Sequence, residues 1–312
     1  MNQILVIILL CVPALAFDSS SQDSSDSSSS DDYFNQLVVF GDSYSDTGNV
    51  YQLTAETFPI SPPYYNGRYS NGPNWVDLLN VNKKTSYAYG SATTDNNLVV
   101  GLTKANTIPV PGIRQQVNTY LSESRPKQVQ RKHRVHVIWG IGNDFVFSAN
   151  PNPVASVNSL MGSVKALLDA GAKNLVVFNG QPAQLLPYSR LSGQPIQLFV
   201  ALTTAINNLI LANLITIKSN YPQANIHLFN ASAVFTKIVS NTASVTFANT
   251  VDPCWIVTGP TTVTPPCPIP SDHVFVDLFH VSAPAHQIIA DAVQPFFAGP
   301  PENTLLPYFT TF

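Results

Sequence analysis

Charged residues are scarce in this chain of 312 residues. Asp, Glu, Lys and Arg make up 11% of it, and 15 basic against 18 acidic residues give a net charge of −3. Binding to the phosphates of a nucleic acid needs a surplus of Lys and Arg, so we expect no nucleic acid partner. The hydrophobic content of 45% suffices for a large core and excludes a fully disordered chain.

Several motifs of common hydrolases and metalloproteins are also absent. The chain contains no Gly-x-Ser-x-Gly motif, which disfavours a hydrolase with a nucleophile elbow. It also lacks the Cys-x-x-Cys and His-Glu-x-x-His spacings that hold zinc in many proteins. We therefore expect neither a metal ion nor another cofactor.

Long apolar runs are missing as well. The run from Ile4 to Val12 has nine residues, whereas a membrane span takes about 20. Ala14-Leu15-Ala16 follows it as a small-x-small cleavage signal. We predict a signal peptide over residues 1–16 and a secreted protein, and the short run disfavours the alternative of a membrane anchor or buried helix. No later apolar stretch reaches that length without interruption, so we expect no transmembrane segment.

A change in composition follows the predicted cleavage point. Asp18 to Asp32 contains nine serines and five aspartates, and such a composition cannot form a core. We interpret residues 17–32 as a disordered linker. Residues 33–312 show no internal repeat and no second shift in composition, so we expect them to form one domain.

Two cysteines remain after the signal peptide, because Cys11 leaves with it. Cys254 and Cys267 lie thirteen positions apart in a Pro- and Thr-rich segment, and an exported protein would oxidise them. Closing a loop of that size stabilises a fold by about 3 kcal/mol. We predict a disulfide rather than free thiols or metal ligands. Asn230-Ala231-Ser232 is the one N-x-S/T sequon and a candidate glycosylation site.

Short apolar runs alternate with longer segments of helical periodicity. Runs this short are typical of strands buried on both faces of a parallel sheet, and the alternation indicates an α/β fold. The predicted strands are Leu37–Phe40, Ser86–Tyr89, Val135–Trp139, Leu175–Phe178 and Asn225–Phe229. The predicted helices are Val154–Ala170, Gln197–Ser219 and Ser282–Val293.

Polar residues gather where these strands end. In a parallel sheet, ligands bind beyond the carboxyl ends of the strands. The segments at those points are Gly41 to Asp46, Gly90 to Ala92 and Gly140 to Asp144, and Asp277 to His280 precedes the last helix. We therefore expect a hydroxyl, a backbone turn, an amide and an Asp/His pair to meet at one edge of the sheet.

That set of groups is suited to acyl transfer. A serine becomes nucleophilic when a base takes its proton, and His280 can act as that base for Ser43. Asp277, three residues before His280, can hold the imidazole in one tautomer. His273 beside Asp272 is a weaker rival base, because adjacent side chains rarely face each other.

The oxyanion of a tetrahedral intermediate needs hydrogen-bond donors. The backbone N–H groups of Ser43 and of Gly90 or Ser91, with the Asn143 amide, are the candidates. The spacing alone does not distinguish Gly90 from Ser91 as the donor of the second loop.

Taken together, five segments resemble the SGNH hydrolases, and within them the GDSL-type esterases and lipases. The segments are FGDSYSDTGN (40–49), GRYSNGPNW (67–75), SYAYGSATT (86–94), GIGNDF (140–145) and DLFHVSAPAH (277–286). The resemblance implies a flavodoxin-like three-layer α/β/α fold with a mainly parallel five-stranded sheet. It also implies metal-free hydrolysis of carboxylic esters, with Ser43, Asp277 and His280 as the triad and Asn143 as an oxyanion donor.

Three positions depart from the family pattern. Tyr44 stands where the name motif has Leu, and we expect little consequence because it lies beyond the nucleophile. Ser91 stands in place of the second Gly of a pair. Val281-Ser282 replaces Pro-Thr after His280, and Ser282 can still cap the last helix.

The sequence thus predicts a secreted, monomeric serine esterase or lipase. Its substrate would be a lipid, an acetylated carbohydrate or a short-chain ester. Two alternatives stay open: an acyltransferase that uses the same triad, and a catalytically silent protein that binds a cell wall or glycan.

Overall fold

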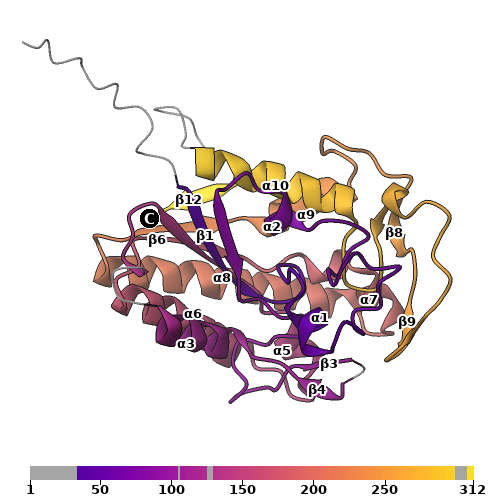
Figure 1. The fold of residues 1–312 in the computed structure, drawn as a ribbon, viewed down its shortest axis with the longest axis horizontal. Coiled ribbons are helices and arrows are strands. Elements are labelled where there is room, and N and C mark those ends of the chain that lie inside the picture. The colour runs from indigo at the N-terminus through magenta and orange to yellow at the C-terminus, as the bar shows by residue number, and fades with distance from the viewer. Residues whose placement is uncertain (1–33, 105, 125–128, 299–307) are drawn as a thin grey trace, which may run out of the picture. The chain divides into compact units, whose positions relative to one another are not determined.

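A six-stranded, mainly parallel sheet forms the centre of the computed structural model (Figure 1). The structure describes residues 34–104, 106–124, 129–298 and 308–312, so the predicted signal peptide and linker lie outside it. The strand order is β12-β7-β6-β5-β1-β2, in which β12 is antiparallel to β7 and the other pairs are parallel. The strands are β1 Gln36–Gly41, β2 Lys83–Ser86, β5 Arg134–Trp139, β6 Asn174–Phe178, β7 Asn225–Phe229 and β12 Phe309–Thr311.

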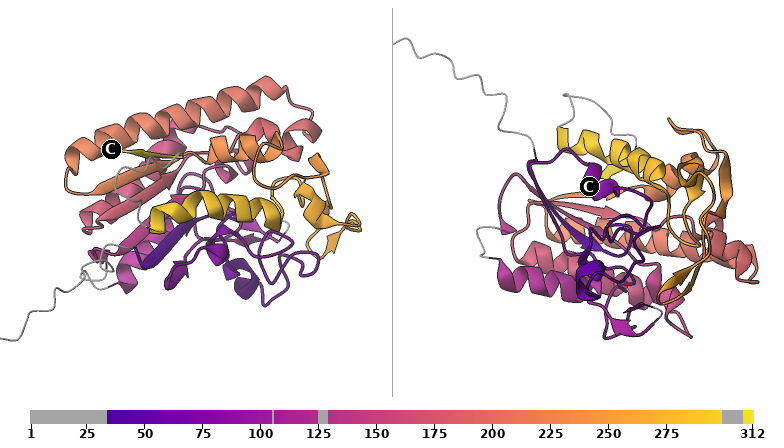
Figure 2. Two further views of the ribbon diagram at one scale, coloured as in Figure 1. Left: turned by 90° about the horizontal axis from the view of Figure 1, so that it is seen from above. Right: turned by 45° about the vertical axis from the view of Figure 1, so that its right-hand side comes forward.

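Helices cover both faces of this sheet because its strands carry apolar side chains on both faces. Along β1, Leu37 and Val39 enter one core cluster, and Val38 and Phe40 enter the other. The first face packs against α2 (Trp75–Leu78), α9 (Ala231–Val239) and α10 (Ala283–Ala298). The second packs against α3 (Ile113–Glu123), α6 (Pro153–Asp169) and α8 (Ile196–Asn220) (Figures 1 and 2). The three layers and the order of the parallel strands are those of the flavodoxin-like arrangement, which confirms the predicted fold class.

Short elements surround the carboxyl edge of the sheet. The right-hand view of Figure 2 brings the segment with β8 and β9 forward. The helical elements are α1 Asn49–Leu53, α5 Asn143–Val146, η1 Ala183–Leu185, α7 Pro187–Leu191 and η2 Pro270–Asp272. The paired strands are β3 Leu102–Thr103 with β4 Ile108–Pro109, β9 Val257–Gly259 with β10 Thr262–Val263, and β8 Asn249–Pro253 with β11 His273–Phe275.

The predicted elements agree with the structure except at the edges of the sheet. The four central strands and the three long helices are present with shifts at their ends. The strand expected over Ser86–Tyr89 is wrong, because β2 covers Lys83–Ser86. Its two lysines are exposed, as is usual for an edge strand, so no apolar run marks it. The added edge strand β12 has three residues and was not predicted.

Helix α8 bears on the expectation of no transmembrane segment, which stays a prediction. By length and composition it could cross a membrane, since its most apolar window has a mean hydropathy of 1.8. Its Thr and Asn residues interrupt the apolar run without adding charge. One side of α8, including Ile206, Ile210 and Leu214, is buried against the sheet and α6.

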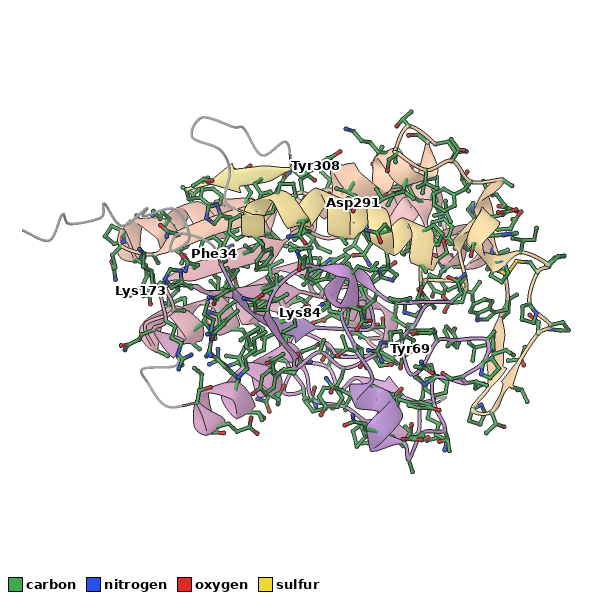
Figure 3. All side chains as sticks on the ribbon, turned by 45° about the horizontal axis from the view of Figure 1, so that its top comes forward. Phe34, Tyr69, Lys84, Lys173, Asp291 and Tyr308 are labelled. Atoms are coloured by element: carbon green, nitrogen blue, oxygen red, sulfur yellow. A yellow bond between two sulfur atoms is a disulfide. The ribbon has the colours of Figure 1, made fainter. Side chains whose placement is uncertain are left out.

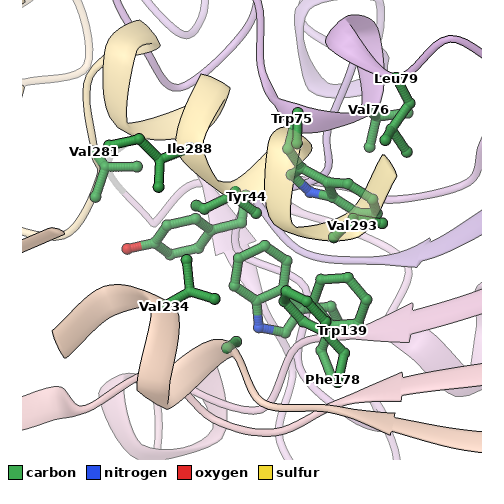
Figure 4. Close-up of a cluster of buried hydrophobic side chains, with 14 of the residues drawn as sticks. Tyr44, Trp75, Val76, Leu79, Trp139, Phe178, Val234, Val281, Ile288 and Val293 are labelled. Atoms are coloured by element: carbon green, nitrogen blue, oxygen red, sulfur yellow. The ribbon is translucent and has the colours of Figure 1, made fainter. Parts of the chain in front are cut away.

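Aromatic side chains fill the core beneath the carboxyl ends of β1 and β5. The Trp139 ring lies 5.0 Å from Tyr44 and 5.0 Å from Phe178, centroid to centroid. Trp75 lies 5.1 Å from Phe178 and completes the cluster (Figure 4). Tyr44 belongs to the turn that follows β1, so the core anchors this turn directly.

A buried histidine on β5 should make stability depend on pH. His136 is fully buried, and Tyr120 Oη lies 2.8 Å from its Nε2. Burial, helped by the Arg134 charge, lowers the pKa of His136 to about 3. The unfolded chain binds a proton here below about pH 6.5 whereas the folded chain does not. The contribution of His136 to the free energy of unfolding therefore falls as the pH drops from 6.5 towards 3.

We expect the variant His136→Gln to remove this loss. Between pH 6.5 and 4.5, its free energy of unfolding should fall by about 2 kcal/mol less than that of the wild type. Urea unfolding at both pH values measures the difference. Parallel pH dependences in the two proteins would contradict the assignment of a neutral, buried His136.

Candidate active site

The turn after β1 carries Ser43 at the carboxyl edge of the sheet. A Cβ on Gly41 would lie 2.1 Å from the Trp139 carbonyl oxygen, so glycine allows the close approach of β1 and β5. Asp42 Oδ1 accepts a hydrogen bond from the Tyr44 N–H, and the Asp42 carbonyl accepts one from the Ser45 N–H. Burial raises the pKa of Asp42 to about 6. The two hydrogen bonds that Asp42 accepts stabilise the turn.

A tight loop from Asp277 to His280 faces this turn. The Val276 N–H donates to the His280 carbonyl at 2.9 Å and closes the loop. Asp277 Oδ1 accepts the N–H groups of Phe279 and His280, each at 2.7 Å. Burial alone would raise the pKa of Asp277, but the His280 charge and the hydrogen bonds that the carboxylate accepts hold it below its usual value. Asp277 is therefore a buried carboxylate that stays ionised.

Ser43, His280 and Asp277 form one chain of contacts. His280 Nε2 lies 2.7 Å from Ser43 Oγ, and His280 Nδ1 lies 2.7 Å from Asp277 Oδ2. Such an arrangement can move a proton from the serine hydroxyl to the imidazole. The rival His273 lies elsewhere, with its Nδ1 3.4 Å from Cys267 Sγ.

The geometry of the loop from Gly90 to Ala92 distinguishes Gly90 from Ser91 as the backbone donor to the oxyanion. The Gly90 N–H donates to Asp46 Oδ2 at 2.8 Å, so it is already engaged. Asp46 also caps α1 through the N–H groups of Gly48, Asn49 and Val50. Ser91 has φ +69°, in a turn closed by the Ala92 N–H on the Tyr89 carbonyl at 3.0 Å. A positive φ at this position of a turn favours glycine, so Ser91 occupies a strained conformation.

Tyr69 packs between Gly90 and the imidazole ring of His280. A Cβ on Gly90 would lie 2.2 Å from Tyr69 Oη, and the Tyr69 ring centroid lies 5.0 Å from that of His280. Figure 3 places Tyr69 at the opposite end of the sheet from Phe34 and Lys173, which precede β1 and β6. Gly90 therefore lets the tyrosine pack against the His280 ring.

Asn143 connects its own loop, Gly140 to Asp144, to the loop from Gly90 to Ala92. It is the first residue of α5, and its Nδ2 donates to the Ala92 carbonyl at 2.9 Å. An amide nitrogen carries two N–H groups, so the second can be donated to a ligand. Thr94 strengthens the connection, because its N–H and hydroxyl both donate to the Asp144 carboxylate.

The two other departures from the family pattern have structural consequences that the sequence did not show. Tyr44 Oη donates to the Phe279 carbonyl at 2.5 Å, a bond that Leu cannot make, so Tyr44 ties the serine turn to the loop that carries His280. Among the described residues, the buried Oγ of Ser282 has no hydrogen-bond partner. Its side chain therefore does not cap α10, and that expectation was wrong. Asn71 Oδ1 instead accepts the Ala283 N–H at 2.7 Å.

Sequence reasoning also missed Tyr64, which donates a hydrogen bond to Asp277 Oδ2. It lies 213 positions from that aspartate, and no motif spans such a separation. Its Pro-Pro-Tyr-Tyr context indicates only a turn.

The predicted disulfide between Cys254 and Cys267 is present. Asn230, the sequon residue, is exposed, and its Oδ1 caps α9 by accepting the Ala233 N–H at 3.1 Å. Glycosylation of Asn230 stays a prediction.

A family model and several known proteins match this chain. A family model described as GDSL-like Lipase/Acylhydrolase matches residues 37–293. The chain is 23% identical to a phosphatidylcholine-sterol acyltransferase of Aeromonas hydrophila over 71% of this chain and 66% of that protein. It is 26% identical to acetylajmalan esterase 2 of Rauvolfia serpentina over 84% and 90%, respectively.

Other matches are partial or distant. The thermolabile hemolysin of Vibrio parahaemolyticus is 27% identical over 72% of this chain and 52% of its own length. The chain thus spans about half to two thirds of the hemolysin and the Aeromonas acyltransferase. A solved GDSL-like lipase from Bacteroides thetaiotaomicron aligns over 85% of this chain and 88% of its own, with a TM-score of 0.41 and 10% identity.

Proposed function

Because this chain belongs to the GDSL-like lipase/acylhydrolase family, we propose that it is a secreted serine hydrolase of carboxylic esters. One observation carries the proposal: the contacts of 2.7 Å that join Ser43 Oγ to His280 and His280 to Asp277. Nucleophilic ester cleavage needs a hydroxyl, a base and a group that orients the base, and these contacts supply all three.

In the proposed reaction, Ser43 Oγ attacks the ester carbonyl carbon while its proton passes to His280 Nε2. When the tetrahedral intermediate collapses, the proton moves to the leaving alcohol and Ser43 becomes acylated. Water then attacks the acyl carbon and loses a proton to His280, and the second collapse releases the acid and regenerates Ser43. Asp277 holds Nδ1–H towards itself throughout, so Nε2 is the nitrogen that exchanges the proton.

We assign the oxyanion to three N–H donors: the backbone of Ser43, the backbone of Ser91 and Asn143 Nδ2. Ser91 is favoured over Gly90 because the Gly90 N–H already donates to Asp46. The Ala92 carbonyl fixes the Asn143 amide, so this donor needs no reorganisation when the charge develops.

Replacing Asn143 with alanine should lower kcat by about 10²- to 10³-fold, the usual loss for one oxyanion donor. KM should change little, because the bond forms mainly in the transition state. Steady-state kinetics on a nitrophenyl ester measure both constants, and thermal melts check the fold. A large rise in KM at unchanged kcat would place Asn143 in ground-state binding instead.

The function is tested by reacting the protein with a serine-directed phosphonate. We expect covalent labelling at Ser43, located by peptide mass spectrometry, and loss of nitrophenyl ester hydrolysis in step with labelling. Activity should survive chelators, since protein donors stabilise the charge in this mechanism. Absence of labelling would favour the silent binding protein, and loss in EDTA with rescue by a divalent ion would overturn the mechanism.

An acyltransferase is the second candidate, and the similarity to the Aeromonas acyltransferase favours it. The acyl-enzyme would pass its acyl group to an alcohol rather than to water. Product analysis with an added alcohol acceptor distinguishes the two. The ester substrate is identified by comparing a chain-length series of nitrophenyl esters with acetylated xylan and a phospholipid.

A further inference from the structure

The carboxylate of Asp277 receives a hydrogen bond from a distant segment of the chain. Tyr64 is 3% exposed, and its hydroxyl donates to Asp277 Oδ2. The same oxygen faces His280 Nδ1 at 2.7 Å. The tyrosine hydroxyl and the imidazole N–H therefore share one oxygen of the carboxylate.

Together with the backbone donors, Tyr64 gives this carboxylate four hydrogen bonds. Oδ1 accepts the Phe279 and His280 N–H groups, and Oδ2 accepts Tyr64 and His280 Nδ1. Burial, followed by the nearby Asp277 charge, raises the pKa of Tyr64 well above its usual value. The hydroxyl thus remains a donor at neutral pH and draws electron density from the oxygen that faces the imidazole.

Packing leaves the Tyr64 ring little freedom. The ring meets Trp255 edge-on, with centroids 5.2 Å apart and planes at 88°. The backbone N–H of Trp255 in turn donates to the Val276 carbonyl at 2.9 Å, and the backbone N–H of the neighbouring Cys254 donates to the Phe275 carbonyl at 3.1 Å. The segment that contains the disulfide therefore lies along the residues that lead to Asp277 and encloses Tyr64 against them.

From these contacts we propose that Tyr64 is a positioning residue for ester hydrolysis, an inference that rests on the proposed function. It acts through Asp277: it directs Oδ2 at His280 Nδ1 and limits the negative charge that the imidazole experiences. Tyr64 touches neither substrate nor Ser43 in this role.

The test is the variant Tyr64→Phe, which keeps the ring and removes the hydroxyl. We expect kcat to fall by about 10- to 100-fold, with KM within about twofold. The acidic limb of the profile of kcat/KM against pH should move to higher pH, because a less hydrogen-bonded Asp277 stabilises the protonated imidazole. An unchanged limb and kcat would overturn the proposal and leave Tyr64 as a packing residue.

A matched control is Tyr120→Phe. Tyr120 is also 3% exposed, and its hydroxyl contacts Arg134 and His136 on β5 rather than the site. This variant should lose stability without a change in kcat or in the pH limb. An equal loss of kcat in both variants would mean that the effect of Tyr64→Phe is only structural.

A double variant tests the route through Asp277. Tyr64→Phe should have almost no further effect on kcat in an Asp277→Asn background, because residues that act as one unit are not additive. A full further loss would overturn the route.

Phosphonate labelling of the wild type separates the two proposals. Absence of labelling at Ser43 refutes the proposed function. Normal labelling together with unaltered kinetics of Tyr64→Phe refutes only the role of Tyr64.

Discussion

Replacing Ser43 with alanine should lower kcat on a nitrophenyl ester by about 10⁶-fold, and His280→Ala should cost about as much. Without Oγ no acyl-enzyme can form, and without Nε2 the base that contacts Oγ is lost. The double variant should be little worse than either single variant, because nucleophile and base act in the same step. At rates this low, a trace of contaminating wild-type enzyme would dominate the measured activity. Its amount must therefore be determined by active-site titration.

His273→Ala is the control for this pair. His273 lies against Cys267 rather than Ser43, so its variant should keep wild-type kcat. All variants should unfold near the wild-type temperature, because Ser43 and His280 lie in loops at the sheet edge. If His273→Ala were inactive while His280→Ala stayed active, the assignment of His280 as the base would be refuted.

Asp277→Asn should lower kcat by about 10⁴-fold, less than the loss at Ser43 or His280. The amide oxygen of Asn can replace Oδ1, which accepts two backbone N–H groups. Its NH₂ group would then face His280 Nδ1 and donate to it. The imidazole would be held with its proton on Nε2, directed at Ser43, and would be unable to accept the serine proton.

Steady-state kinetics and thermal melts of Asp277→Asn measure this effect, with Asp272→Asn as the control. Asp272 is exposed in η2, so its variant should keep full activity. If Asp277→Asn retained more than a tenth of wild-type kcat, the aspartate would not orient the base.

Local sequence patterns predict the parts of this fold that depend on local burial. The strands β5, β6 and β7 show apolar runs because both faces of the sheet are covered, whereas β2 at the edge carries exposed lysines and shows none. The polar groups near Ser43, Asn143 and His280 can be placed at one edge because parallel strands end there.

Contacts between distant segments leave no such local pattern. Tyr64 meets Asp277 across 213 positions, and Asn71 caps α10 across 212. A tyrosine or an asparagine in a loop is compatible with many partners, and only the packing of the whole chain selects one. For the same reason, sequence alone did not distinguish Gly90 from Ser91, since the bond from Gly90 to Asp46 is a tertiary contact.

The antiparallel strand β12 has a consequence for self-association. Phe309, Thr310 and Thr311 pair with Phe229, Leu228 and His227 of β7, and the Phe309 ring stacks on Phe296 of α10. An apolar strand with an open edge is a template for pairing with another molecule and for aggregation. A chain cut before Phe309 would keep Ser43 and His280 in place, yet it would expose β7 to intermolecular sheet formation. We therefore expect these few residues, remote from the catalytic chemistry, to limit the pairing of β7 with other molecules.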